Sequence, residues 1–357
     1  MEPVLDAIFS FSGGRNYLHR QVCREFRWRI KADAHTYLHY ADELCEEGLW
    51  EESHVKTCFV LEMVDAAIGQ GLVNLLDKLK TYVPHDVANI AAFQGNLEVL
   101  QWAKENGYSL GDFCVTEAVR GGHLHVLRWL DGNGCYTYDD LYCLAAEVGS
   151  VEILEWLDDR DDYYTDDPCA VCNCAAREGH IQVLEWCLKK GWAKDSGACY
   201  FTVKGDQLET LKWLRDKDFP WDEDVCSLAA EKGNLEILQW ARENNCPWDE
   251  NTCSNAAEGG HLKILQWCRE KSCPWNEEVY IRAVSIDRLD ILMWAKENGC
   301  PKPENSDVCA IAAYRGNVLI LEWAVKEGFL LDKGVYKSAA FGGNTQVLSW
   351  LTKMVAQ

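Results

Sequence analysis

Cysteine is the residue type here that most readily suggests a chemical site, because the chain contains 18 of them. Three stand close together as Cys169-x-x-Cys172-x-Cys174, a spacing at which thiolates can bind zinc. A structural zinc site needs a further pair of ligands, and no second Cys or His pair stands at ligand spacing. Cys172 also falls on a position that recurs along the chain as a small hydrophobic residue. We therefore predict no metal site.

Aspartates form a second candidate in the segment 158–167, DDRDDYYTDD. The segment lacks the glycine and the terminal glutamate of a calcium-binding loop, so we predict a solvated loop that could attract a basic partner. Elsewhere, no Ser, His and Asp set, no glycine-rich phosphate loop and no isolated carboxylate pair stands out. These patterns predict no catalytic residue, no enzymatic activity and no cofactor.

The elements that carry these residues belong to a repeat with a nearly constant period. A tryptophan marks each copy, and the steps between neighbouring tryptophans are 27 residues in seven cases and 30 or 29 in the other two. Self-similarity at such a period indicates a stacked array of helical repeats, in which each copy packs on its neighbours. We predict structural roles for Trp102, Trp129, Trp156, Trp186, Trp213, Trp240, Trp267, Trp294, Trp323 and Trp350.

The second helix of each repeat is predicted from the apolar residues around its tryptophan. Leucine stands two residues before the tryptophan in every copy, a β-branched residue stands three before it, and an aliphatic residue stands five before it in all but the last. Together with the tryptophan, these positions form one apolar stripe. We predict that this stripe is the contact between the two helices of a repeat.

The first helix is predicted from alanine pairs ten and eleven residues before the tryptophan, such as Ala229-Ala230. Small side chains there allow close approach to neighbouring helices. A glycine seven before the tryptophan, replaced only by Asp206 and Asp287, predicts a left-handed residue that ends this helix. The next position offers N-caps for the second helix, namely Asn96, Ser150, Asn234, Asn317 and Asn344, or a histidine that caps or packs, namely His123, His180 and His261.

The same register explains many of the cysteines. Cysteine recurs fourteen residues before the tryptophan, where we predict that it packs in the core as a small hydrophobe. These residues are Cys172, Cys199, Cys226, Cys253 and Cys309. Loops such as Cys246-Pro247-Trp248-Asp249 then separate one repeat from the next, with proline ending one helix and aspartate capping the following one.

The stretch from Leu228 to Leu238, LAAEKGNLEIL, resembles the helical half of an ankyrin repeat. Where ankyrin repeats carry Thr-Pro-Leu-His, this chain has the segment 224–227, DVCS, and its period is shorter than that family's. The resemblance is to the Trp-bearing, CPW-containing ankyrin variety of microbial eukaryotes and large DNA viruses, which as a class bind other proteins. It implies an all-α solenoid of about ten helix-turn-helix repeats over residues 81–357, with hairpin fingers shortened or absent.

The N-terminal segment, residues 1–34, resembles a shortened F-box. Its "IFSF" run at Ile8–Phe11, the break at Gly13-Gly14 and the "VCREF" run at Val22–Phe26 carry the resemblance. In that family such helices dock on the adaptor of a cullin-type ubiquitin ligase. The implied adaptor-binding residues are Leu5, Ile8, Phe9, Phe11, Leu18, Val22 and Phe26.

The alternative for the N-terminal segment is a helical pair that covers the first repeat. Residues 35–80 keep the alanine and leucine spacing of a repeat but have Asp77 in place of the tryptophan. We predict that they form a degenerate N-terminal cap, since terminal repeats have one face without a neighbour.

The charge of the chain limits the kinds of partner that we expect. The net charge of −22 and the pI near 4.8 argue against nucleic acid as the main ligand and favour a basic or neutral protein. The start of the chain lacks a secretory signal, and no apolar run is long enough for a membrane span. We predict an intracellular monomer, cytoplasmic or nuclear, with reduced thiols.

We expect the binding residues of such an array at positions that differ between repeats, because positions that pack in every repeat require similar side chains in every repeat. Positions thirteen and nine before the tryptophan, one turn apart on the first helix, vary freely. In ankyrin-like arrays the first helices line the concave face that meets partners, and aromatic residues and arginine are enriched in such contacts. The predicted partner-binding residues are Phe93, Arg120, Arg177, Tyr200, Lys204, Glu231, Glu258, Tyr314 and Phe341.

The function predicted from these features is a protein–protein interaction scaffold that holds a client on its concave helical face. A more specific version makes it the substrate receptor of a cullin-type ubiquitin ligase through the F-box-like segment. The alternatives are a plain ankyrin-repeat binding protein or a viral or host effector with no ligase link. The alternative for the variable positions is that they are ordinary solvated surface and bind no partner.

Overall fold

The computed structural model describes residues 57–137, 140–160, 165, 167–192 and 194–355. These residues form 22 α-helices and one short 3-10 helix, with no strand among them. The F-box-like segment and the first part of the predicted cap lie outside the described residues. In chain order the helices are α3 (Thr57–Gln70), α4 (Val73–Lys78), η2 (Lys80–Tyr82), α5 (Val87–Gln94), α6 (Leu97–Glu105), α7 (Asp112–Arg120), α8 (Leu124–Gly132), α9 (Leu141–Glu147), α10 (Val151–Asp158), α11 (Pro168–Glu178), α12 (Ile181–Lys189), α13 (Gly197–Lys204), α14 (Leu208–Asp216), α15 (Glu223–Lys232), α16 (Leu235–Glu243), α17 (Glu250–Glu258), α18 (Leu262–Glu270), α19 (Glu278–Ser285), α20 (Leu289–Glu297), α21 (Asp307–Arg315), α22 (Val318–Lys326), α23 (Lys333–Phe341) and α24 (Thr345–Val355).

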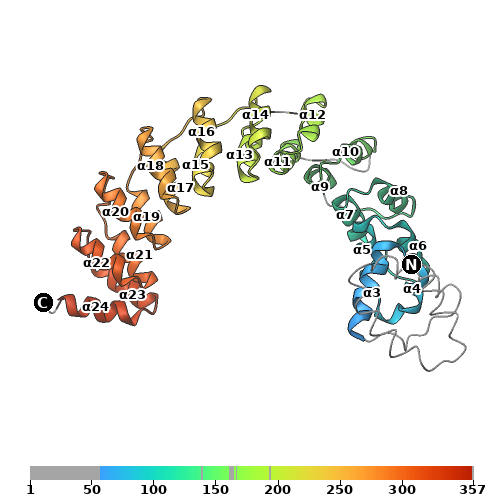
Figure 1. Cartoon of the computed structure of the whole chain (residues 1–357), viewed down its shortest axis with the longest axis horizontal. Helices are drawn as coiled ribbons and strands as arrows, with labels where there is room; N and C mark the ends of the chain where they lie inside the picture. The colour runs from blue at the N-terminus through green and yellow to red at the C-terminus, as the bar shows by residue number, and fades with distance from the viewer. Residues whose placement is uncertain (1–56, 138–139, 161–164, 166, 193, 356–357) are drawn as a thin grey trace, which may run out of the picture. The chain divides into compact units, whose positions relative to one another are not determined.

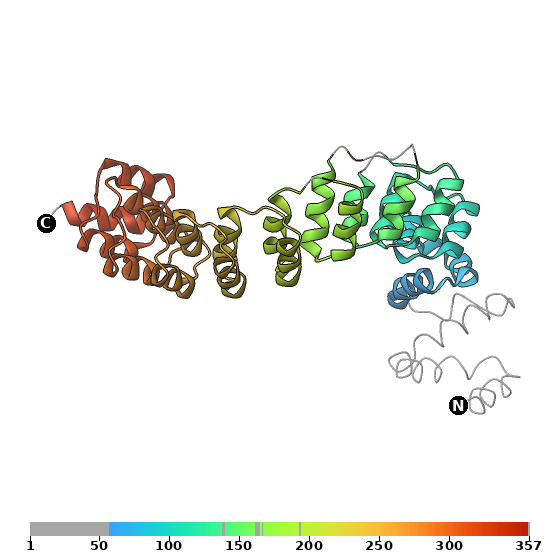
Figure 2. The same cartoon turned by 90° about the horizontal axis from the view of Figure 1, so that it is seen from above.

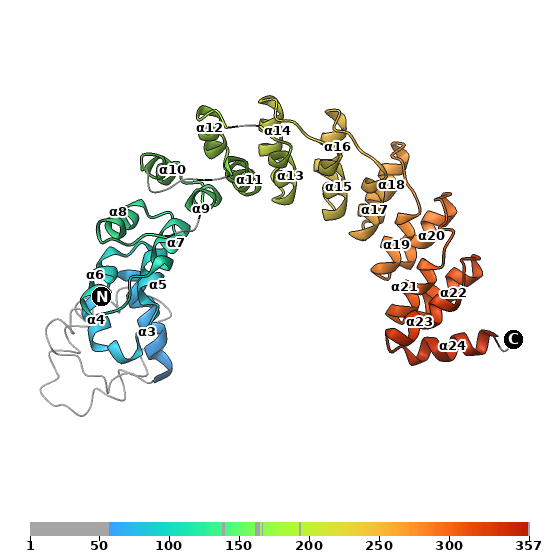
Figure 3. The ribbon, with the colours of Figure 1, turned by 180° about the vertical axis from the view of Figure 1, so that it is seen from behind.

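The chain divides into an N-terminal unit, Met1–Tyr164, and a C-terminal unit, Thr165–Gln357. In both, odd-numbered first helices alternate with even-numbered second helices, as the period predicts (Figure 1). Within the C-terminal unit, the first helices lie along the inner side of a curve and the second helices along its outer side. Figures 2 and 3 show the same succession of pairs from two other sides. The prediction of helix pairs without strands is confirmed for the described residues.

The turn inside each repeat is confirmed in all ten copies. The residue seven before the tryptophan has a positive φ throughout, from 60° at Asp287 to 83° at Gly179. Asp206, the other replacement, adopts the same conformation at 62°. Asp tolerates this region better than most residues with a Cβ, so the turn survives both substitutions.

The glycine of this turn also makes room for the neighbouring repeat. A Cβ at Gly95 would lie 2.5 Å from the ring of His123, and a Cβ at Gly233 would lie 2.6 Å from the ring of His261. Neither histidine caps its own helix through its side chain. The packing role predicted for these two histidines is therefore confirmed, and the capping role is wrong.

The predicted asparagine and serine caps are mostly confirmed. Asn96, Ser150, Asn234 and Asn317 each accept a hydrogen bond from the backbone N–H three residues later. Asn344 instead donates through Nδ2 to the Ala313 carbonyl of the preceding repeat, at 3.0 Å. Of the caps at the loops, Asp249 accepts from the Asn251 N–H, whereas Asp222 makes no such bond.

The core stripe of the second helix differs from the predicted one. Positions three before and one after the tryptophan are buried in every repeat, and the leucine two before it is buried in all but the last. Among the ten repeat tryptophans, Trp102 and Trp186 are buried and the other eight are half-buried. Residues at −3, −2 and +1 share one helix face, since +1 follows −3 by four residues and −2 by three. The tryptophan lies on the flank of this face, so the contact is centred on −3, −2 and +1 rather than on the whole predicted stripe of −5, −3, −2 and the tryptophan.

The half-buried tryptophans pack against the loops instead. The Trp240 ring meets Trp221 of the preceding loop edge-on, with centroids 5.8 Å apart. Trp248 and Trp267 repeat this contact at 5.9 Å, and the Arg242 guanidinium lies 4.1 Å from the Trp248 centroid. Trp294 likewise meets a tryptophan of the preceding loop. Four other repeat tryptophans meet an aromatic residue of the loop that follows them, namely Trp102, Trp186, Trp213 and Trp323. These contacts give the tryptophans a structural role at the loops as well as between the helices.

The first helices pack directly on one another within each unit, as α5 does on α7 and α15 on α17. The position eleven before the tryptophan is alanine in nine repeats and Thr202 in the other, and it is buried in all ten. The next position is buried too, except at Ala340 in the last first helix. The close approach expected from the alanine pairs is confirmed.

Two leucines of α16 test the corrected stripe. Leu238 is fully buried, whereas Leu235, one turn earlier, is half-buried. We predict that Leu238→Ala lowers the free energy of unfolding by about 2–5 kcal/mol and that Leu235→Ala costs clearly less, because a buried leucine leaves a cavity behind. Urea unfolding of both variants measures the difference. Equal costs would contradict the assignment of the core to −3, −2 and +1.

Candidate functional site

The variable position nine before the tryptophan forms a row at the ends of the first helices. In the C-terminal unit this row contains Arg177, Lys204, Glu231, Glu258, Ser285, Tyr314 and Phe341. In the N-terminal unit it contains Phe93, Arg120 and Glu147. Each residue lies in the last turn of its first helix or at its final position, just before the turn that leads to the second helix.

Backbone contacts hold neighbouring members of the row close together. A Cβ at Gly121 would lie 2.1 Å from the carbonyl oxygen of Phe93, and a Cβ at Gly259 would lie 2.0 Å from that of Glu231. A Cβ at Gly205 would lie 1.7 Å from the carbonyl oxygen of Arg177, and a Cβ at Gly342 would lie 2.2 Å from that of Tyr314. At these four joints glycine lets the end of one first helix touch the next. Glycine stands eight residues before the tryptophan in these four repeats alone, so the repeat pattern does not reveal its role.

The exposure of the row agrees with a surface that is open to partners. Phe341 is 86% exposed, Tyr314 53% and Phe93 51%, although large apolar side chains are usually buried. Arg120, Lys204 and Glu231 are exposed as well, and Arg177 and Glu258 are half-buried. All of these predicted residues therefore reach the surface of their units.

The second predicted position, thirteen before the tryptophan, is different. Thr116, Ser227 and Ser254 are buried at 3–4% exposure. In these three repeats the side chain is covered, whereas Lys337 at the same position is exposed. The expectation that this position is surface is wrong for these repeats, and Tyr200, half-buried, packs edge-on against Phe201 at 5.6 Å.

Three charged members of the row form partly exposed ion pairs with residues outside the row, two within the same helix and one with the next first helix. Arg120 pairs with Glu117 at 2.8 Å, Arg177 with Glu178 at 2.7 Å, and Glu258 with Arg282 at 2.6 Å. Exposed pairs of this kind contribute little to stability, typically about 0–1 kcal/mol. These charges can therefore exchange their neighbours for a partner's groups at small cost.

The aromatic end of the row forms a stacked pair. The rings of Tyr314 on α21 and Phe341 on α23 lie nearly parallel, with centroids 6.2 Å apart. An exposed aromatic pair offers a rigid apolar surface, and such residues dominate the energetics of many interfaces. Phe341 is the more exposed of the two, and it ends α23, the first helix of the last repeat.

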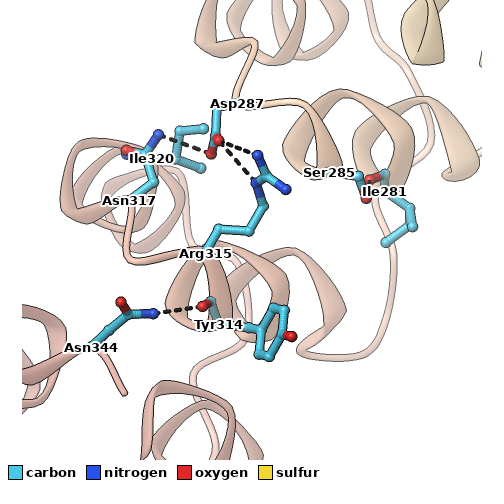
Figure 4. Close-up of polar contacts among 8 residues, drawn as sticks. All are labelled: Ile281, Ser285, Asp287, Tyr314, Arg315, Asn317, Ile320 and Asn344. Carbon is cyan, nitrogen blue, oxygen red and sulfur yellow. Dashed lines mark hydrogen bonds and ion pairs between the residues drawn. The ribbon is translucent and has the colours of Figure 1, made fainter. Parts of the chain in front are cut away.

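A polar clamp formed by Asp287, Arg315 and Asn317 adjoins Tyr314, the residue before Arg315 in the chain (Figure 4). Asp287, in the turn after α19, accepts hydrogen bonds from Arg315 Nη2 at 2.7 Å and from Asn317 Nδ2 at 3.1 Å. Burial opposes ionisation of Asp287, but these bonds outweigh it and keep the pKa of the carboxyl below its usual value. One joint further on, Asn344 Nδ2 donates to the carbonyl of Tyr314. The clamp explains how an aspartate is accommodated in the turn.

The five cysteines fourteen residues before the tryptophan lie in the core, as the register predicts. Cys172, Cys199, Cys226, Cys253 and Cys309 are buried. Cys172 contacts Cys187 of the second helix, and this hydrogen bond together with burial raises the pKa of the Cys172 thiol. Burial likewise raises the pKa of Cys199 to about 12. In the part of the chain that the structure describes, no group of three His, Cys, Asp or Glu side chains is placed to hold a metal ion.

A shallow depression lies on the second-helix side. It has a volume of about 420 Å³ and is lined by Gln239, Arg242, Glu243, Trp248, Trp267 and Lys271. Its tryptophans already contact each other, and its charges are of both signs. It follows from the packing of loop against tryptophan and shows no preference for one kind of ligand.

Comparisons with known proteins do not assign a family. No protein-family model matches the sequence. No curated protein matches it. Among solved structures, the chain is similar to the crystal structure of the pentatricopeptide repeat protein PPR10 from maize, with 12% sequence identity and a TM-score of 0.33. That match covers 100% of this chain and 68% of the other, and a score this low carries no conclusion about repeat type or ligand.

Among the described residues, no helix is both long enough and apolar enough to cross a bilayer.

Proposed function

We propose that this chain is a protein-binding scaffold of the short-period ankyrin type, which holds a client protein on the row at the ends of its first helices. The observation that carries the proposal is the contrast between constant packing and variable surface. The positions that pack are alanine, cysteine and aliphatic residues in nearly every repeat, whereas the row changes from repeat to repeat. Packing accounts for the first set but gives no reason for exposing Tyr314 and Phe341.

The ankyrin assignment is supported by the local structure of the repeat. Each first helix leads into its second through a left-handed residue, and alanines allow the first helices to approach closely. The loops that would carry a hairpin finger contain no strand among the described residues. These are the features expected of ankyrin-like helix pairs whose fingers are shortened.

The proposed role is binding rather than catalysis. The described members of the row supply aromatic surface and charge, and none of them pairs a nucleophile with a general base. The net charge of −22 favours a basic or neutral protein as client over nucleic acid. No cofactor and no membrane are part of the proposal, and the protein is proposed to act as an intracellular monomer.

Four substitutions in the row test the proposal. We predict that Phe93→Ala, Arg120→Ala, Arg177→Ala and Tyr314→Ala together reduce client binding by at least about tenfold, since hot-spot residues each contribute about 1–2 kcal/mol or more. Client proteins selected from a display library with the wild-type chain serve as ligands, and binding is measured by biolayer interferometry.

A matched control uses four exposed residues of the second helices. The variant with Glu98→Ala, Arg128→Ala, Gln182→Ala and Leu319→Ala should bind like the wild type, because these side chains lie away from the row. Both variants should melt within a few degrees of the wild type, as exposed substitutions rarely change stability much. Equal binding by the row variant and the wild type would refute the proposal.

The more specific proposal is a substrate receptor of a cullin-type ubiquitin ligase. Its support is the F-box-like sequence of Ile8–Phe11 and Val22–Phe26. We predict that the full chain captures a ligase adaptor and cullin and that Ile8→Asp with Phe11→Asp abolishes this capture, because a charge cannot be buried in an apolar contact without loss. Affinity purification with quantitative mass spectrometry measures both. Clients captured without adaptor by the wild type would favour the plain scaffold.

A further inference from the structure

The row of the C-terminal unit has an order along the chain. It begins with two cations, Arg177 and Lys204, and continues with two acids, Glu231 and Glu258. After Ser285, it ends with an aromatic pair. Ser285 is uncharged, and its hydroxyl donates to the Ile281 carbonyl of its own helix at 2.8 Å (Figure 4). All of these residues belong to one compact unit, so their order is a property of that unit alone.

The spacing expected for the row fits the side-chain repeat of a polyproline II helix. Packed helices lie about 8–10 Å apart, so neighbouring members of the row are separated by about that distance. A polyproline II helix repeats every three residues and rises about 3.1 Å per residue, so its equivalent side chains recur about every 9 Å. Every third side chain of such a segment would meet the next member of the row. A β-strand, by contrast, turns alternate side chains to opposite faces.

We propose that the C-terminal unit binds an extended, polyproline II-like segment of a partner, with complementary side chains at three-residue intervals. Two acidic residues of the segment meet Arg177 and Lys204, and two basic residues meet Glu231 and Glu258. Apolar residues meet the pair formed by Tyr314 and Phe341. The six steps from Arg177 to Phe341 correspond to a segment of about 18 residues. This inference rests on the proposed function and names the chemistry of its client.

The charges of the row are accessible for this purpose. Lys204 and Glu231 are exposed. Arg177 and Glu258 keep 35% and 42% of their side-chain surface in water and form ion pairs with Glu178 and Arg282. A chain with a net charge of −22 repels an acidic ligand in general, so the two adjacent cations give an acidic pair one defined place to bind. Opposite placement of the charges in a ligand would set like charges against each other, which costs affinity.

Two synthetic peptides of about 21 residues test the order directly. The matched peptide carries a glutamate pair, a lysine pair and, after one neutral interval, a leucine pair, each at three-residue spacing with proline between. The exchanged peptide has the same composition with the glutamate and lysine pairs swapped. Each is made in both chain directions, labelled with fluorescein and titrated with the full-length protein. In one direction, the matched peptide should bind at least about tenfold more tightly than the exchanged one.

A charge-reversal variant supplies the control. Arg177→Glu, Lys204→Glu, Glu231→Lys and Glu258→Lys together should invert the preference, so that the exchanged peptide binds more tightly. All four positions reach the surface, so the variant should melt like the wild type. Equal binding of the two peptides, or an uninverted preference in the variant, would overturn the inference.

The failure of this inference can be told apart from failure of the proposed function. If the peptides show no preference while the row-alanine variant still loses its selected clients, only the ordered segment is refuted. If the row-alanine variant also keeps its clients, the row is not the binding surface and both proposals are overturned.

Discussion

The structure depends on direct contact between successive first helices. At Gly259 this contact is so close that an added Cβ would lie 2.0 Å from the carbonyl oxygen of Glu231. Buried alanines eleven residues before the tryptophan continue the same contact along the helix. Helices of eight to eleven residues are marginal alone, so most of their stability comes from this packing. In the C-terminal unit, it also sets the first helices on the inner side of the curve (Figure 1).

This contact separates packing from recognition within a single helix. Positions fifteen, fourteen and eleven before the tryptophan face neighbouring helices and are constrained to small or aliphatic side chains in most repeats. The position nine before it lies at the end of the helix, where the backbone is fixed but the side chain is free to vary. A row of this kind can change its chemistry, as from Arg177 to Phe341, without cost to the stack. Turn contacts such as that of Asp287 with Arg315 and Asn317 keep the row's backbone in place.

The repeat, the helix pairs and the left-handed turns were predictable from sequence because they depend on local chemistry. Gly233 and Asp287 occupy equivalent positions, and both adopt positive φ. The tryptophans were misplaced because periodicity reveals which positions are constant but not whether they face a helix or a loop. Trp240 packs against Trp221 of the preceding loop, whereas Trp102 packs against Tyr108 of the following one. Ser227 belongs to a position that varies between repeats and was therefore predicted to be surface, but at 4% exposure it is buried.

Gly259→Ala tests the central contact most directly, because its two effects have opposite signs. Gly259 has a φ of −72°, which alanine adopts freely, so local propensity alone predicts a gain of about 0.4–1 kcal/mol. The contact with Glu231 predicts a loss. Gly132 in α8 has no atom within 4 Å of an added Cβ, so Gly132→Ala serves as control. In native-state hydrogen exchange, we predict lower protection of α15 and α17 in Gly259→Ala and no loss in α8 for Gly132→Ala. Unchanged or raised protection of α15 and α17 would contradict the account.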